Sequence, residues 1–281
     1  MGVRSVLERI FAGRWIAGAE TGDAVRRAKR LNALGISAIL NYIGEDLTDA
    51  RDINDAVSTN LRLIAEIRKA KLNASVSLKL TALGLCLSRR AARKNYDRIV
   101  GAARRAGVFV WIDAESEDTI EDTIAIYEGQ VRKHGVGITV QAYLRSSGKN
   151  LQRLAKRKAV VRLVKGAYSE SGKIAFETRA QTTGNYRTLM HEAFANLKEF
   201  TIATHDSSLI DEAMLLNRSH RRKITYAMLN GIRNTYAARL AEQGYSVAIY
   251  VPFGTRWFGY SLRRLREESH LLLVLRSLLG G

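Results

Sequence analysis

Eight short runs of apolar and β-branched residues alternate with longer amphipathic segments, and this alternation constrains the fold more than any other feature. Most of the runs are nearly continuous in apolar character, which is typical of parallel strands buried on both faces. Helix-like segments such as Asp52–Ala70 and Thr119–Lys133 lie between them. The predicted strands are Ser37–Ile43, Ala74–Leu80, Val108–Asp113, Ile138–Leu144, Ala159–Val164, Phe200–Thr204, Lys223–Met228 and Ser246–Val251.

The length of the chain fits one closed barrel. A (β/α)₈ barrel takes about 250 residues, and this chain has 281 with no Pro-rich or Ser/Gly-rich linker. We therefore expect an α/β fold of the TIM-barrel type, as one catalytic domain over residues 1–281, with helices before the first strand and a helix after the last. An open doubly wound sheet, which differs in strand order, is the alternative.

The charge of the chain is strongly positive. A formal net charge of +18 and an isoelectric point near 10.3 would attract nucleic acid, anionic lipid or a phosphate-rich cofactor. A generally solvated basic surface explains the same numbers. The longest apolar runs, such as Leu271–Leu275, are shorter than the roughly 20 residues that span a bilayer, no signal-peptide core follows Met1, and Cys86 is the only cysteine. We therefore expect a cytoplasmic protein without disulfides.

The common motifs for cofactors, metals and nucleophiles are missing. No G-x-x-x-x-G-K-[ST] or G-x-S-x-G segment occurs, and Gly135-Val136-Gly137 lacks the third glycine of a dinucleotide fingerprint. The five histidines show no spacing of zinc ligands. We expect no bound metal.

Polar side chains gather at the carboxyl ends of the predicted strands. In a barrel these ends form the catalytic mouth, and buried charges there are costly unless a ligand or an ion pair satisfies them. Any single one of these residues could instead cap the helix that follows. The set comprises Glu45, Lys79, Asp113, Glu115, Gln141, Tyr143, Arg162, Lys165, Tyr168, Thr204, His205, Asp206, Asn230 and Tyr250.

Two longer segments resemble motifs of a known family. Residues 161–168 read V-R-L-V-K-G-A-Y, and residues 260–267 read Y-S-L-R-R-L-R-E. They resemble the R-L-V-K-G-A-Y strand end and the Y-x-x-R-R-L-x-E helix of the proline dehydrogenases. Eight shorter matches follow the family order, and the resemblance spans residues 15–268. These are Ala17-Gly18, Gly44-Glu45, Leu78–Thr81, Asp113–Glu115, Gln141–Leu144, Ala203–His205, Met228–Ile232 and Tyr250–Gly254.

The spacing of polar residues in the terminal segment is consistent with the resemblance. Tyr260, Arg263, Arg264 and Glu267 share one helical face. Adjacent guanidinium groups suit a carboxylate, with which each can form charge-assisted hydrogen bonds. A solvated face with an Arg263–Glu267 pair is the alternative.

The resemblance implies the FAD-dependent oxidation of L-proline to 1-pyrroline-5-carboxylate in proline catabolism, with electrons passed to a quinone. Lys79, Arg263 and Arg264 would hold the proline carboxylate. Arg264 would lie near Asp113, and Arg263 would pair with Glu45 to close the site. The motif also includes Glu267, and the walls of the proline ring would be Tyr168, Leu229, Tyr250 and Tyr260.

The resemblance also implies a set of flavin contacts. Gln141 and Arg162 would contact the flavin rings, with Arg162 near N5. The rest of the FAD would be lined by Val164, Lys165, Gly166, Ala167, Thr204 and His205. The chain departs from the family pattern at Ser169, Asp206, Thr225 and Ala227. Asp206 would place a negative charge near the adenosine side of the FAD.

Two other functions fit parts of the sequence. A related flavin barrel could act on 4-hydroxyproline or another cyclic amine, although Tyr250 leaves little space for a ring hydroxyl. A non-enzymatic basic scaffold could bind nucleic acid or membrane, but it would not explain the paired arginines. We expect peripheral membrane contact through an apolar stripe in His270–Leu279 or packing of that stripe on the barrel, and no nucleic-acid partner.

Overall fold

Eight parallel strands close into a barrel in the order β1 to β8, with β8 paired to β1. The computed structural model describes residues 15–131, 135–166 and 170–257. The closed order confirms the predicted barrel over the open sheet. The strands are β1 Ser37–Tyr42, β2 Ala74–Leu78, β3 Val110–Ile112, β4 Val136–Gln141, β5 Val160–Val164, β6 Glu199–Ala203, β7 Lys223–Leu229 and β8 Val247–Phe253.

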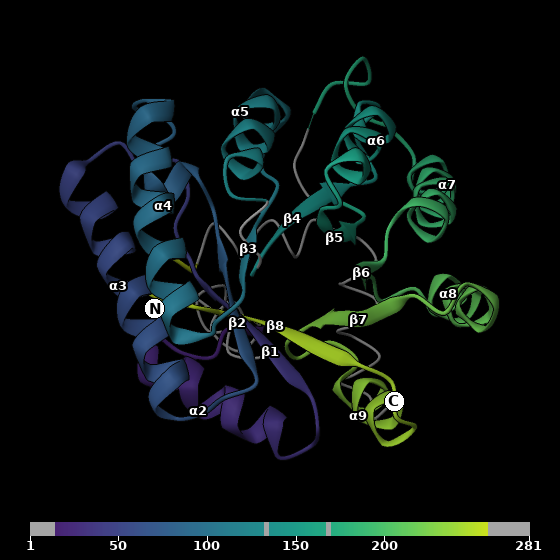
Figure 1. Cartoon of the computed structure of the whole chain (residues 1–281), viewed down its shortest axis with the longest axis horizontal. Coiled ribbons are helices and arrows are strands. Elements are labelled where there is room, and N and C mark those ends of the chain that lie inside the picture. Colours follow the sequence, from purple (N-terminus) through teal and green to yellow (C-terminus); the bar gives the residue numbers. More distant parts are fainter. Residues whose placement is uncertain (1–14, 132–134, 167–169, 258–281) are drawn as a thin grey trace, which may run out of the picture.

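Helices surround the barrel (Figure 1). The helix α2 precedes β1 and packs against β1 and β8; the terminal helix expected after β8 lies outside the described residues. No helix in the described ranges is long and apolar enough to cross a membrane. The helical segments are α2 Thr21–Asn32, α3 Ala50–Lys69, the short 3₁₀ helix η1 Thr81–Leu83, α4 Arg89–Ala106, α5 Glu117–Glu128, α6 Ser147–Lys156, α7 Arg179–Asn196, α8 Ser207–His220 and α9 Asn234–Glu242.

The predicted strand limits are wrong mainly at β4. The apolar run suggested Ile138–Leu144, whereas the ladder covers Val136–Gln141. Tyr143 and Leu144 are nevertheless buried, and the backbone nitrogens of Ala142 and Tyr143 still donate to the carbonyls of Val164 and Lys165, both at 2.8 Å. Burial therefore continued past the last strand residue, and hydrophobicity alone could not mark the boundary.

An apolar cluster fills part of the barrel interior. Ile39, Trp111, Ala227 and Ala248 form one buried cluster that spans four strands. Gly137 faces Trp111 in the register, and a Cβ atom at Gly137 would lie 2.5 Å from the indole ring. A glycine is therefore required there, because the indole occupies that space.

Candidate functional site

A buried ion pair crosses the barrel at its mouth. Asp113, which follows β3, is 8% exposed, and Arg162 on β5 is 3% exposed. Arg162 Nη2 pairs with Asp113 Oδ1. Ser77 Oγ donates to the same oxygen at 2.8 Å, and Tyr250 Oη donates to Asp113 Oδ2 at 2.7 Å. Side chains from β2, β5 and β8 therefore converge on the carboxylate that follows β3.

The remaining contacts of Arg162 fix its guanidinium. Nε and Nη2 donate to Thr139 Oγ1 at 3.2 and 2.8 Å. The guanidinium carbon lies 5.0 Å from the ring centre of Trp111 and 5.4 Å from that of Tyr250, within cation–π range. Nη1 is buried and has no hydrogen-bond partner among the described residues. A buried donor without an acceptor is costly, and an acceptor atom of a bound ligand would satisfy it.

Lys79 and Glu45 form a second ion pair at the mouth. They lie in the loops after β2 and β1, and Lys79 Nζ is 2.5 Å from Glu45 Oε2. The sequence suggested Arg263 as the partner of Glu45. Arg263 lies outside the described residues, so that pairing stays a prediction, but Lys79 occupies one carboxylate oxygen of Glu45.

Glu115 was not among the predicted site residues, although it was recognised as a polar residue of the mouth. Its side chain is 2% exposed and accepts hydrogen bonds from the backbone nitrogen of Thr81 at 3.1 Å and from the Thr81 hydroxyl. Burial raises the pKa of Glu115 to about 7. Its backbone oxygen accepts from Gln141 Nε2 at 2.7 Å, so this predicted flavin-contacting side chain is held by the neighbouring loop.

Asp206, one of the departures from the family pattern, is paired with a lysine. Lys165 Nζ donates to Asp206 Oδ2 at 2.9 Å and to Thr183 Oγ1 at 3.0 Å. The other carboxylate oxygen caps α8 by accepting from the nitrogen and hydroxyl of Ser208 at 3.2 and 2.8 Å. Burial alone would raise the pKa of Asp206, but these hydrogen bonds from Lys165 and Ser208 hold it below its usual value. The negative charge at this departure from the family pattern is therefore compensated within the chain.

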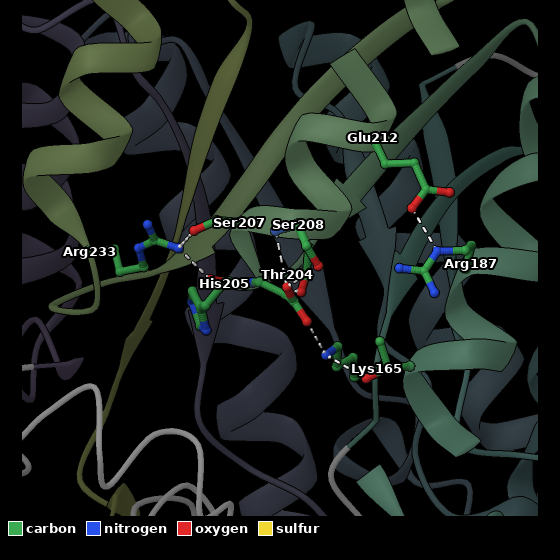
Figure 2. Close-up of polar contacts among 10 residues, drawn as sticks. Lys165, Arg187, Thr204, His205, Ser207, Ser208, Glu212 and Arg233 are labelled. Atoms are coloured by element: carbon green, nitrogen blue, oxygen red, sulfur yellow. Dashed lines mark hydrogen bonds and ion pairs between the residues drawn. The ribbon is translucent and has the colours of Figure 1, made fainter. Parts of the chain in front are cut away.

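A network around the start of α8 also includes Arg233, which the sequence reasoning missed. Figure 2 shows Lys165 and Arg233 approaching the start of α8 from two sides. Arg233 Nη1 donates to the His205 carbonyl at 2.5 Å and to Ser207 Oγ at 2.8 Å. The nitrogen of Leu229 donates to His205 Nε2 at 2.9 Å. Because Nε2 accepts this bond, the ring is neutral with its proton on Nδ1.

The residues that the resemblance assigns to the proline ring and to the FAD lie, where the structure describes them, at the same end of the barrel. Leu229 and Tyr250 are register partners on β7 and β8. Gly166 has φ of +109°, and a Cβ atom there would collide with the Tyr143 ring, so only glycine allows this approach of the chain. Val164 ends β5, and Thr204 Oγ1 accepts from the Asp206 nitrogen at 3.2 Å. Ala167, Tyr168, Tyr260, Arg263, Arg264 and Glu267 lie outside the described residues.

Known proteins resemble this chain along most of its length. A family model described as proline dehydrogenase matches residues 24–272. The chain belongs to the proline dehydrogenase family. It is therefore an oxidoreductase of that family, as its two longer motifs indicated.

Relatives of similar length support the assignment. This proline dehydrogenase family member is 33% identical to proline dehydrogenase 1 of Bacillus subtilis over 276 residues, which are 96% of this chain and 91% of the relative. It is 32% identical to proline dehydrogenase 2 of the same organism, over 92% of this chain and 87% of the relative. A proline dehydrogenase of Deinococcus radiodurans is 28% identical, over 96% of this chain.

Solved structures support the fold. The crystal structure of proline utilization A from Bdellovibrio bacteriovorus, a protein inactivated there by N-propargylglycine, matches this chain with a TM-score of 0.85 and 20% identity. The match covers 95% of this chain but 34% of the larger one. At this identity the likeness concerns the barrel, and it confirms the predicted fold class.

Proposed function

We propose that this protein oxidises L-proline to 1-pyrroline-5-carboxylate in proline catabolism, with FAD as the hydride acceptor and a quinone as the final electron acceptor. The observation that carries the proposal is the buried Arg162, whose Nη1 lacks a partner among the described residues at the mouth of a barrel of this family. A flavin ring atom is an acceptor of the kind that this donor needs. Related activities on 4-hydroxyproline are disfavoured because Tyr250 is anchored on Asp113 at 2.7 Å.

The donor set of the mouth fits a flavin dinucleotide. Arg162 and Gln141 would contact the flavin rings, and Lys165, which also pairs with Asp206, would face the anionic groups. When bound, the flavin supplies the acceptor for hydride from the carbon next to the proline nitrogen. The other contacts proposed for the FAD are Val164, Gly166, Ala167, Thr204 and His205. This chain supplies orientation and exclusion of water rather than a nucleophile.

The substrate would be held by its carboxylate. Lys79, Arg263 and Arg264 provide the cations, and Arg263 together with Glu45 would close the site over the ligand. The ring would be confined by Tyr168, Leu229, Tyr250 and Tyr260. A fixed carboxylate orients the ring for hydride transfer. Solvent would take the amine proton as the substrate binds.

A visible spectrum tests the proposed function. We expect the purified protein, or the protein reconstituted with FAD, to absorb blue light as flavoproteins do and to bleach on anaerobic addition of L-proline. 4-Hydroxy-L-proline at the same concentration is the matched substrate control and should bleach it more slowly. A protein that binds no flavin, or whose flavin is reduced equally by both compounds, would contradict the proposal.

The quinone would be met at an anionic membrane surface. The net charge of +18 supports this, because each basic residue near such a surface contributes about 1 kcal/mol. The apolar stripe in His270–Leu279 lies outside the described residues and stays a predicted contact. We expect the protein to sediment with vesicles containing phosphatidylserine at low salt and to be released at high salt, whereas neutral vesicles serve as the control. Protein that stays in the supernatant with anionic vesicles at low salt would rule out this association.

A further inference from the structure

The Glu115 carboxylate clamps one residue of the neighbouring loop. Both of its oxygens accept from Thr81, one from the backbone nitrogen at 3.1 Å and one from the hydroxyl. Thr81 begins η1 and is 1% exposed. Both residues are almost fully buried, so bulk water competes little for these hydrogen bonds.

Thr81 passes this restraint to the loop after β1. The nitrogen of Asp46 donates to Thr81 Oγ1 at 3.0 Å, and the nitrogen of Leu47 donates to the Thr81 carbonyl at 3.2 Å. Glu45 precedes Asp46, and Lys79 lies two positions before Thr81. The two loops that carry the Lys79–Glu45 ion pair, with its 2.5 Å separation, are therefore joined through Thr81.

The main chain of Glu115 serves a different neighbour. Its carbonyl accepts from Gln141 Nε2 at 2.7 Å, and a change of side chain leaves this acceptor in place. A substitution at Glu115 should therefore act on the Lys79 side of the site more than on the side proposed for the flavin.

We propose that the side chain of Glu115 is a positioning residue that holds the Lys79–Glu45 pair where Lys79 can bind the proline carboxylate. This inference rests on the proposed function above. Lys79 is paired directly with Glu45, whereas the oxygens of Glu115 are directed at Thr81. The effect of Glu115 on substrate binding is therefore exerted through the loop rather than as a direct contact with Lys79.

The clamp is strongest when Glu115 is ionised. Its two oxygens then accept charge-assisted hydrogen bonds from both Thr81 donors, whereas a protonated acid would have to donate to the Thr81 hydroxyl and would lose the charge assistance. Burial raises its pKa to about 7, Lys79 opposes the rise, and Asp113 adds to it. The other ionisable groups of the adjoining loops are Glu45, Asp46, Asp49 and Cys86. As the pH falls through about 7, the clamp should loosen and carboxylate affinity should fall.

The variant Glu115→Gln tests the proposal, with Asp118→Asn as the matched control. Asp118 is exposed at the start of α5. We expect Glu115→Gln to raise the KM for proline on the order of tenfold, with kcat and bound flavin nearly unchanged, and Asp118→Asn to leave all three unchanged. A KM equal to that of Asp118→Asn would overturn the proposal. A lower KM would also overturn it, because repulsion of the substrate carboxylate by Glu115 would then dominate.

Cyclopentanecarboxylate provides a pH-dependent readout, since it lacks the titrating amine of proline. Its inhibition constant against the wild type should rise as the pH is lowered from about 8 to about 6. This rise should be absent in Glu115→Gln. Equal pH dependence in both proteins would contradict the role of the ionised carboxylate.

Thr81→Val keeps the backbone donor but removes the hydroxyl, and it carries the test if Glu115→Gln does not fold. It should also raise the KM for proline, and a KM equal to that of Asp118→Asn would overturn the clamp. Where Glu115→Gln folds, the rise in KM of the double variant, expressed as free energy, should be less than the sum of the two single rises. Additive effects would separate Thr81 from Glu115 and overturn the clamp. A wild type that fails to oxidise proline would reject the proposed function instead, so the two failures are distinguishable.

Discussion

Arg162→Met should lower the free energy of unfolding of the flavin-free protein by about 3–5 kcal/mol, because it leaves the buried Asp113 without its cation. Methionine replaces much of the apolar length of the arginine, so the cavity contribution is kept small. Urea unfolding monitored by circular dichroism measures the change. The variant should also lose bound flavin, since the unpartnered Nη1 donor is removed.

A second arginine provides the control. Arg153 pairs with Glu121 and Glu128, both at 2.8 Å, but its side chain is 35% exposed. Arg153→Met should therefore cost about 1 kcal/mol or less. Adding Asp113→Asn to Arg162→Met should recover part of the lost stability, because the uncompensated charge is removed. If Arg162→Met costs no more than Arg153→Met, the buried pair does not contribute as its geometry indicates.

Arg264→Met should raise the KM for proline by the equivalent of about 2–5 kcal/mol while flavin stays bound, because a charge-assisted contact with the carboxylate is lost. Steady-state kinetics together with the flavin absorbance separates the two effects. This prediction rests on the motif, since Arg264 lies outside the described residues.

Arg266→Met is the matched control for Arg264→Met. Arg266 belongs to the same segment and carries the same charge, but it occupies the variable position of Y-x-x-R-R-L-x-E. Its substitution should leave the KM close to that of the wild type. Equal changes in the two variants would indicate a general effect of surface charge and would remove Arg264 from the substrate site.

The sequence predicted the fold from the alternation of its segments. The run at Ala159–Val164 became β5 at Val160–Val164, since parallel strands buried on both faces are mostly apolar, and the one charged residue, Arg162, is paired with Asp113. The hydrophobic pattern was less informative at β4, where buried residues continue beyond Gln141. Backbone hydrogen bonds to the neighbouring chain also continue there, from Ala142 and Tyr143 to Val164 and Lys165, so the limit of the strand depends on backbone geometry that side-chain hydrophobicity does not report.

The sequence also identified individual residues of the mouth, but it did not predict their pairing. Arg162 was expected at the flavin and Asp113 near Arg264, yet the structure joins Arg162 to Asp113 across 49 positions of the chain. Asp206 was expected as a negative charge near the adenosine side of the FAD, and the structure adds that it is paired with Lys165. These pairs depend on barrel register and on side-chain rotamers, which bring strand ends together regardless of their separation in sequence.

The sequence by itself determined the kind of barrel, the family and the residue types at the mouth, because these follow from local periodicity and from short motifs. Only the tertiary structure decided which side chains form hydrogen bonds and ion pairs with one another. Tyr250 meets Asp113 across 137 positions, and Glu115 meets Thr81 across 34. Such contacts are fixed when the closed sheet sets the distance between strand ends and burial removes the water that would otherwise satisfy each polar group.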